Sequence, residues 1–194
     1  LGDSSVASNA SDLVSAIASL NYSATITTQV LGTDYTGNDI ASGGYSLIIM
    51  QTNGGQNGDA ALSNNLKTFM DNGGHFIGQT FLWNIYPSGF DFGYMPFYGP
   101  VGQSFNGGTP TVVNSHAILS GISVGSVSGP VNSVSTLSSN STLVLSYPDN
   151  TPLLAIQQVN SSRRVGVNAY GAPDYNSSIG QMMGNGVLWC LNLI

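Results

Sequence analysis

Three adjoining segments between residues 45 and 84 carry the clearest pattern of hydrophobic and polar positions in the chain. Leu47–Met50 is a short apolar run between glycine-rich turns, which is typical of a strand buried on both faces. His75–Thr80 has a similar character. Between them lies a stripe with helical spacing, formed by Leu62, Leu66, Phe69 and Met70. Strand, helix and strand in this order predict a βαβ unit with parallel strands and a right-handed crossover.

Residues at both ends of the predicted helix fit helix termini. Asp59 precedes the stripe and is a candidate N-cap, because its carboxylate can accept hydrogen bonds from the first free N–H groups. Gly73 and Gly74 follow the last hydrophobic residue, where a residue in the left-handed conformation commonly closes a helix.

The other segments predict further helices and strands around this unit. Val6–Leu20 predicts a helix, and Ala24–Leu31 predicts a strand with one wetter face. Phe90–Pro110 is punctuated by Gly and Pro and is dense in aromatic residues, so we expect an irregular flap over residues 85–110. Beyond it we expect strands at Thr111–Val113, Ile122–Val131, Thr142–Tyr147, Leu153–Gln157 and Arg163–Ala169, and a closing helix at Ser178–Ile194.

Charged residues are unusually rare. They make up 6% of the 194 residues, against about 25% in ordinary domains. Glycans, burial in an assembly or an unusual medium can replace surface charge, and all three indicate a secreted or cell-surface protein. The net charge of −6 and the scattered basic residues argue against nucleic acid as a partner. No apolar run is long enough for a membrane span. The chain starts at Leu1, so we expect a mature product or an excised repeat.

The chain has one cysteine, Cys190, which excludes an internal disulfide. It lies in the apolar run Val187–Leu191, which is typical of a small buried hydrophobic residue; an intermolecular disulfide is the alternative. His75 begins a predicted strand, and His116 lies far from it in sequence. Because no metal-ligand spacing connects them with the scattered Asp residues, we expect neither a metal site nor a cofactor.

Several stretches together resemble the class I glutamine amidotransferase-like superfamily, and within it the trehalose-utilisation-like and surface-protein branches. They are Ser46–Gly55, Asp71–Gly74, Ile77–Leu82, His116–Gly121, Arg164–Pro173 and the last helix with Trp189. The resemblance spans nearly the whole chain. It implies one α/β domain over residues 1–194, with a flavodoxin-like, three-layer arrangement. The sheet would be mostly parallel, with helices on both faces and additional β-strands in the second half.

Catalytic members of this superfamily place a Cys on a sharp strand-to-helix turn, and a His and a Glu after a later strand. Matching by position, the resemblance puts Thr80 at the Cys, Tyr170 at the His and Ala172 at the Glu. A Thr without an adjacent base is not an activated nucleophile. We therefore expect a protein without triad chemistry.

The carboxyl ends of the strands form the usual ligand crevice of such sheets. The residues expected around it are Asp3, Asn53, Gln79, Thr80, Trp83, His116 and Tyr170. His116 also fits a purely structural role in its loop. The aromatic residues from Trp83 to Tyr98 can stack on sugar rings or pack beneath the flap.

Five N-x-[ST] sequons are candidate glycosylation sites: Asn9, Asn21, Asn140, Asn160 and Asn176. A chain so rich in Asn, Ser and Thr contains several such sequons by chance. Asn21 and Asn160 lie in predicted turns and are the best placed.

The start of the chain bears on assembly. In the superfamily's fold the first strand lies centrally, beside the strands at Thr25–Leu31 and Leu47–Gln51, yet only Leu1–Asp3 represent it here. Since unpaired central strands are costly, we expect upstream residues, a strand donated by another chain or a rearranged sheet.

These observations together predict a non-catalytic extracellular domain with a structural or interaction role. The leading version is a self-assembling subunit of a filament, sheath or surface layer. Its partners would be copies of itself or other surface proteins, with glycans as a further ligand class. The alternatives are a carbohydrate-binding module that uses residues 83–98 and a hydrolase with a relocated active site.

Overall fold

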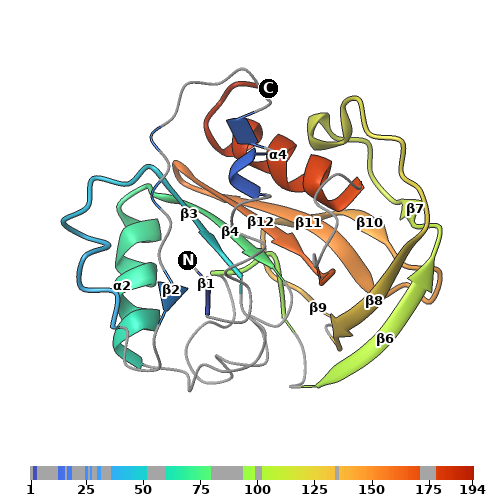
Figure 1. Ribbon diagram of the computed structural model, residues 1–194, viewed down its shortest axis with the longest axis horizontal. Helices are drawn as coiled ribbons and strands as arrows, with labels where there is room; N and C mark the ends of the chain where they lie inside the picture. The colour runs from blue at the N-terminus through green and yellow to red at the C-terminus, as the bar shows by residue number, and fades with distance from the viewer. Residues whose placement is uncertain are drawn as a thin grey trace.

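A mixed six-stranded sheet forms the centre of the molecule (Figure 1). Three neighbouring strands are parallel: β3 (Leu47–Met50), β4 (His75–Gln79) and β12 (Ser162–Val167). The sheet continues with antiparallel β11 (Pro152–Val159), β10 (Ser141–Ser146) and β7 (Thr111–Val112). The computed structural model describes residues 2–3, 13–15, 17–18, 25, 27, 30–31, 36–51, 60–79, 94–98, 102–133, 136–170 and 178–194.

The predicted βαβ unit is confirmed. Helix α2 (Ala60–Asp71) connects β3 to β4, which pair in parallel, while Asp59 lies outside the described residues. The helix ends in a Schellman motif: the N–H of Gly73 donates to Met70 O and that of Gly74 to Phe69 O, both at 3.0 Å. Gly73 has a φ of +91°, which a residue without a side chain adopts at little cost. The two glycines therefore close the helix as their position predicts.

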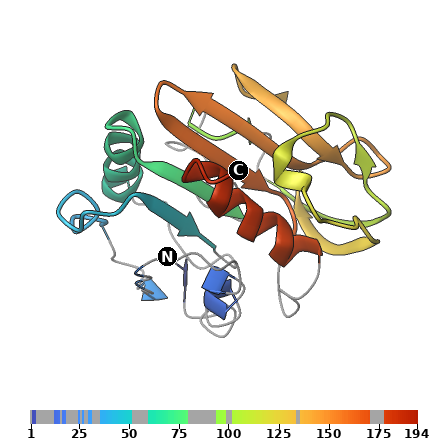
Figure 2. The ribbon, with the colours of Figure 1, turned by 90° about the horizontal axis from the view of Figure 1, so that it is seen from above.

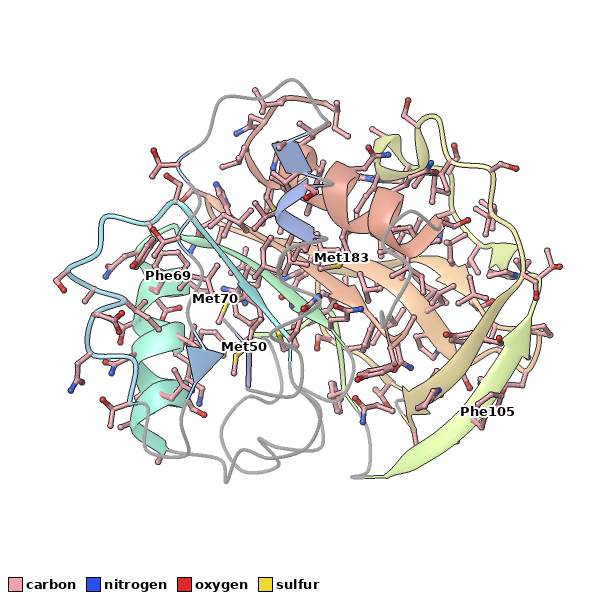
Figure 3. All side chains as sticks on the ribbon, viewed as in Figure 1. Met50, Phe69, Met70, Phe105 and Met183 are labelled. Carbon is pink, nitrogen blue, oxygen red and sulfur yellow. The ribbon has the colours of Figure 1, made fainter. Side chains whose placement is uncertain are left out.

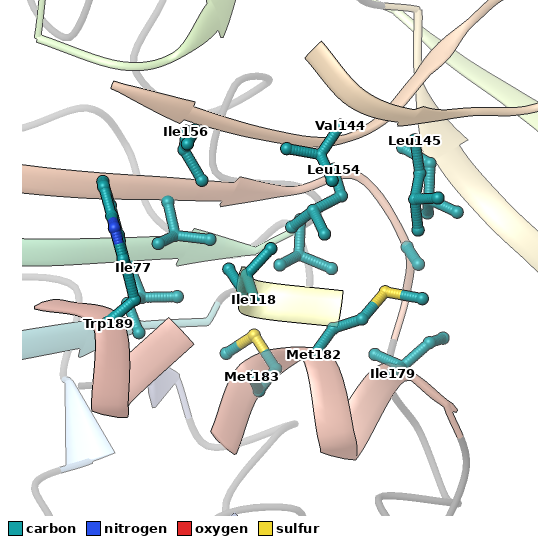
Figure 4. Packing of buried hydrophobic residues seen from close by; sticks show 14 of the residues in the cluster. Ile77, Ile118, Val144, Leu145, Leu154, Ile156, Ile179, Met182, Met183 and Trp189 are labelled. Carbon is teal, nitrogen blue, oxygen red and sulfur yellow. The ribbon is translucent and has the colours of Figure 1, made fainter. Parts of the chain in front are cut away.

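The two faces of the sheet carry separate cores, because successive side chains of a strand point to opposite sides. Phe76 of β4 packs with Leu62, Leu66 and Met70 of α2, and we call this group the α2-side core. The next residue, Ile77, packs on the opposite face against α4 (Ser178–Cys190), in the α4-side core. Figure 2 shows α4 lying across its face of the sheet. Figure 4 shows the α4-side core, with Met182, Met183 and Trp189 of α4 facing Ile77, Leu154 and Ile156 of the sheet.

The expected α/β fold with helices on both faces and additional strands is therefore present. Some of the predicted helices and strands are present, but their ends differ from the predicted ends by a few residues. Helix α4 ends at Cys190 instead of Ile194, and β12 ends at Val167 instead of Ala169. The expected strand Ile122–Val131 is wrong in its first half, since β8 covers Val127–Asn132.

The expected irregular flap over residues 85–110 is wrong for part of its length. It contains β5 (Phe97–Tyr98), which pairs with β9 (Thr136–Leu137), and β6 (Gln103–Gly108), which pairs with β8. Sequence periodicity misses β6 because Asn106, Gly107 and Gly108 carry no strand signal of their own. Its conformation is fixed by pairing with β8, a strand that begins only at Val127.

The amino-terminal residues form a second parallel pair. Strand β1 (Gly2–Asp3) pairs with β2 (Val30–Leu31), which confirms that the first strand lies beside the second. Thr25 and Thr27 lie outside β2, so the expected strand is shorter there. Among the described residues β1 does not pair with β3. Residues 13–15 and 17–18 are helical, and Leu13 and Ile17 are buried in the α4-side core.

Candidate functional site

A chain of buried amide groups joins the carboxyl ends of the three parallel strands. Gln51 follows β3, and its Nε2 donates to Gln79 Oε1 at the end of β4. Gln79 Nε2 in turn donates to the carbonyl oxygen of Ala169, just beyond β12, at 3.0 Å. Both side chains are buried, with exposed fractions of 6% and 2%. The expected crevice residue Gln79 therefore lies at the strand ends, held on both sides by hydrogen bonds.

A second amide network lies directly beside the first. The side chain of Asn168 is fully buried and bonds to both backbone groups of Asn132: Oδ1 accepts from the N–H at 2.8 Å, and Nδ2 donates to the carbonyl at 3.0 Å. Its Nδ2 also donates to Pro152 O, and the Tyr147 hydroxyl donates to Asn168 O, both at 3.0 Å. Burial raises the pKa of Tyr147 well above its usual value, so its hydroxyl stays neutral.

These groups suit structural hydrogen bonding better than acid–base chemistry. Carboxamides do not exchange protons near neutral pH, and a tyrosine kept neutral by burial is a poor base. The network satisfies backbone groups that would otherwise be buried without partners. One atom departs from this pattern: Asn132 Oδ1 is buried and accepts no hydrogen bond from the described residues.

Both histidines lie at the other end of the sheet. Arg163, near the start of β12, donates its backbone N–H to His75 Nδ1 at 3.1 Å and its Nη1 to Trp189 O. The rings of His116 and Trp189 meet edge to face, with centroids 5.5 Å apart. Gln79 pairs with Val167, which lies four residues beyond Arg163, or about 13 Å along the strand. The expectation that His116 lines the same crevice as Gln79 is therefore wrong.

His116 has a local structural role instead. Its Nδ1 accepts the N–H of Ile118 at 3.2 Å and so caps the short helix η2 (Ala117–Leu119), which packs on α4. Burial, and secondarily the positive charge of Arg163, lower the pKa of His116 and of His75 below the usual value. Both imidazoles are thus neutral near pH 7. His75 is the first residue of β4, as the sequence predicts.

Cys190 is a buried hydrophobic residue, as its apolar surroundings predict. It is fully buried in the α4-side core, and burial raises the pKa of its thiol far above the usual value. A thiol at this depth reaches no other chain while the domain is folded, which disfavours the intermolecular disulfide.

Sequence reasoning missed a buried cation on the α2 side of the sheet. Arg164 is 1% exposed, and its guanidinium contacts Gln157 Oε1 and Ser162 Oγ, both at 3.2 Å. It also lies 5.0 Å from the centre of the Tyr94 ring. The Tyr94 hydroxyl donates to Asp71 Oδ2 at 2.8 Å. The carboxylate lowers the cost of burying the charge, although burial still lowers the pKa of Arg164.

Two of the three described aromatic residues of the segment 83–98 are directed inward. Phe97 is fully buried, Tyr98 is half-buried, and Tyr94 is held by Arg164 and Asp71. Phe97 and Tyr94 belong to the α2-side core rather than to an open platform for sugar rings. Trp83 lies outside the described residues.

Other predicted site residues divide into two groups. Tyr170 is described and half-buried, next to the Ala169 carbonyl that Gln79 binds. The exposed sequon residues Asn140 and Asn160 lie in turns, with φ of 61° and 52°. Outside the described residues lie Thr80, Ala172, Asn53, Asn9, Asn21 and Asn176, and for Asp3 only the backbone is described.

In the described parts of the chain, nowhere do three His, Cys or Asp side chains gather closely enough to hold a metal ion. The described helices are also too short or too polar to cross a lipid bilayer.

Comparison of the fold with solved structures gives likenesses that span nearly the whole chain. A protein from Bacteroides uniformis ATCC 8492 described as ThuA-like shares 16% identity at a TM-score of 0.63, over 94% of this chain and 84% of that one. A cytoplasmic protein from Salmonella typhimurium LT2 shares 13% identity at a TM-score of 0.61, over 95% and 85%. A β-galactosidase from Rahnella sp. R3 shares 13% identity at a TM-score of 0.56, over 94% of this chain and 27% of that one.

No protein-family model matches the chain, and neither does any curated protein sequence. At identities this low, the structural likeness shows the fold and no more. That fold is the one adopted by ThuA-like proteins, which have a class I glutamine amidotransferase-like architecture.

Proposed function

We propose that this chain is a non-catalytic, extracellular structural domain that self-assembles into a filament, sheath or surface layer. In this proposal it keeps the scaffold of the amidotransferase-like superfamily, in its trehalose-utilisation-like and surface-protein branches, without the catalytic residues. Partners would be further copies of the chain or other surface proteins.

The character of the strand ends supports the non-catalytic part of the proposal. By position, Thr80, Tyr170 and Ala172 replace the Cys, His and Glu of catalytic superfamily members. The described groups at this edge include the amides of Gln51 and Gln79, which already bind each other and the backbone. Nucleophilic catalysis needs a nucleophile next to a base, and amides supply neither.

The distribution of charge carries the assembly part of the proposal. Residues 92–148 contain no Asp, Glu, Lys or Arg, although the whole chain has a net charge of −6. The same stretch holds four of the seven large hydrophobic side chains that are exposed among the described residues: Phe105, Val112, Val113 and Leu137. A stretch with exposed apolar groups and no charged residue of its own favours association, because it adds no repulsion between two copies.

Size measurement and imaging test this function directly. We expect the purified chain to show concentration-dependent association in sedimentation velocity, and native material to show ordered assemblies in electron micrographs. A monodisperse monomer up to the highest soluble concentration would refute the assembly role. Turnover of an amide or glycoside substrate that is lost in Thr80→Ala would instead favour a hydrolase.

Glycosylation tests the extracellular part of the proposal. Asn140 and Asn160 are exposed in turns between strands, where a glycan can be attached without disturbing either core. In a glycosylating host we expect the chain to gain the mass of at least one N-glycan. Asn140→Gln and Asn160→Gln should each remove one glycan if both sites are occupied. An unmodified mass in the secreted product would count against glycans as the cover of this surface.

A further inference from the structure

Strand β6 is the outermost strand of a two-stranded ribbon. Its partner β8 holds the ribbon to the molecule, because Val127 and Val131 are buried in the α4-side core. Ser104, Phe105 and Gly107 of β6 are exposed, and Phe105 has 75% of its surface in contact with solvent. Figure 3 shows Phe105 at the end of the molecule away from α2. Among the described residues, β6 pairs with no strand other than β8.

The hydrogen bonds beside the ribbon show which backbone groups of β6 point outward. The N–H of Ser133 donates to Gly102 O at 3.1 Å, so this pair is hydrogen-bonded across the ribbon. The N–H of the preceding residue, Asn132, donates at 2.8 Å to Asn168, away from β6. Antiparallel pairs alternate between hydrogen-bonded and non-hydrogen-bonded positions. The pair Gln103–Asn132 is therefore non-hydrogen-bonded, and the alternation continues along the ribbon.

This alternation places Phe105 at an outward-directed position. Phe105 pairs with Pro130, which has no N–H and fits a non-hydrogen-bonded position. At Gly107, a Cβ atom would lie 3.1 Å from the Cβ of Ser128, in keeping with the close approach of such pairs. The N–H and C=O groups of Gln103, Phe105 and Gly107 thus point away from β8, toward the edge of β6 that pairs with no other described strand.

Nothing in the sequence of β6 protects this edge. Natural edge strands commonly carry Lys, Pro or inward-pointing charges that prevent pairing with another chain. Residues 103–108 contain none of these, and the proline of the ribbon is in β8 instead. The nearest described carboxylate contact is Asp149, which Asn106 binds at 2.9 Å; Asn106 alternates with Phe105 and so projects from the other face.

The geometry points to a second copy of this chain as the occupant of the edge, with β6 pairing antiparallel to β6 of the partner about a two-fold axis centred on Phe105. This assignment rests on the proposed self-assembly and specifies one of its contacts. Phe105 would pair with Phe105 of the partner subunit, and Gln103 with Gly107 of the partner subunit. The outward groups then form roughly six main-chain hydrogen bonds, and the two aromatic rings become cross-strand neighbours.

Two features favour a copy over an unrelated partner. The edge is self-complementary, since the same three residues supply donors and acceptors on both sides of a two-fold contact. Each copy also carries a net charge of −6, but the two strands of this ribbon contain no charged residue, and the Asp149 carboxylate that Asn106 binds lies on the face opposite Phe105. On the Phe105 face, the ribbon itself therefore adds no repulsion between two acidic molecules. The low repulsion at the ribbon would also favour another acidic protein. A basic partner, in contrast, would be attracted to the acidic parts of the surface.

Sedimentation velocity of full-length variants tests the contact. In Phe105→Lys, two like charges would lie opposite each other, and we expect the dimer dissociation constant to rise about tenfold or more. The matched control is Asn64→Lys, an exposed position on α2 with the same change of charge at the other end of the molecule. Phe105 is mostly exposed, so both variants should fold, which circular dichroism verifies.

Cysteine cross-linking tests the register. In Phe105→Cys the two paired Cα atoms would lie about 5.5 Å apart, within the range of a disulfide. Ser104→Cys is the matched control, because its counterpart in this register is Asn106 of the partner subunit. Mild oxidation should link Phe105→Cys efficiently and Ser104→Cys poorly, while the buried Cys190 stays unreactive.

The outcomes separate this contact from the proposed function. Weaker association of Phe105→Lys alone, with linking of Phe105→Cys, supports the contact. Association that is unchanged in Phe105→Lys, or equal linking of the two cysteine variants, overturns the contact and leaves self-assembly standing through another surface. A wild-type chain that stays monomeric overturns both.

Discussion

Replacing Gln79 with Leu tests whether the amide chain at the strand ends holds the sheet together or is kept for a ligand. Leucine has a similar volume, so the substitution removes hydrogen bonds without leaving a large cavity. Two buried groups then lose a partner: the Nε2 of Gln51 and the carbonyl oxygen of Ala169. Neither group lies at the surface, because Gln51 is 6% exposed and Ala169 is 2% exposed.

The expected loss follows from these two groups. Each of these lost hydrogen bonds costs up to about 1–3 kcal/mol, so Gln79→Leu should lower the free energy of unfolding by up to roughly 2–6 kcal/mol. A domain of this size is stable by only about 5–15 kcal/mol, so the change is large. In the double variant Gln51→Leu/Gln79→Leu the Gln51 amide, which loses its bond to Gln79 in the single variant, is itself absent. The double variant should be less destabilised than the sum of the two single variants, with a coupling of about 1 kcal/mol or more.

Urea denaturation followed by circular dichroism measures these differences, as a shift of the midpoint at constant slope. A matched control is Thr68→Leu on the exposed side of α2, which should change little. Residues kept for a ligand often reduce stability, and replacing them then stabilises the fold. An unchanged or higher midpoint in Gln79→Leu would therefore refute the structural role and favour a binding site at the strand ends.

Three further predictions concern residues outside this chain of amides. The folded protein holds the pKa of His75 and His116 below the unfolded value of 6.5, so the stability that these residues contribute should be complete above pH 6.5 and should fall as the pH drops below it. Melting curves of the wild type and of a His75→Gln/His116→Gln variant at pH 8 and about pH 5 measure this loss, and an equal loss in the two proteins would contradict the prediction. Gly73→Ala should lower the free energy of unfolding by about 1 kcal/mol or more, because φ is +91° and the new Cβ would lie 2.7 Å from the Ser161 hydroxyl oxygen. Gly44→Ala, at φ +64° with open space around it, should carry only the backbone cost, so equal shifts of the urea midpoint in the two variants would disprove the contact with Ser161. Cys190 should react with a thiol reagent only on unfolding, since burial both covers it and raises its pKa, and rapid labelling of the native chain would show that the α4-side core opens.

The sequence predicts the βαβ unit well because every signal there is local. The apolar run Leu47–Met50, the stripe on α2 and the glycines at 73 and 74 each act within a few residues of themselves. The final helix is predicted for the same reason, and its end is misjudged because Leu193 and Ile194 continue the hydrophobic pattern after the helix stops.

The candidate site depends on contacts that no local pattern contains. Gln79 is predicted at the strand ends, but its partner Gln51 is found only once the parallel register of β3 and β4 is known. His116 is misplaced because its motif fixes a local turn, not the end of the sheet at which that turn lies. Apart from Ser162, Arg164 draws its partners from β11, α2 and residue 94, so its burial could not be read from its neighbours in sequence.

The locations of the polar groups indicate that stability and association depend on different parts of this fold. The amides of Gln51 and Gln79 lie inside, so replacing them should change the free energy of unfolding. Phe105 lies outside both cores, on a strand anchored through β8, so replacing it should change association alone. The variants Gln79→Leu and Phe105→Lys should then move the two quantities independently, as is usual for distant sites. If Phe105→Lys destabilises the monomer as much as Gln79→Leu does, the ribbon is part of the folded core, and an edge held open for a second copy loses its physical basis.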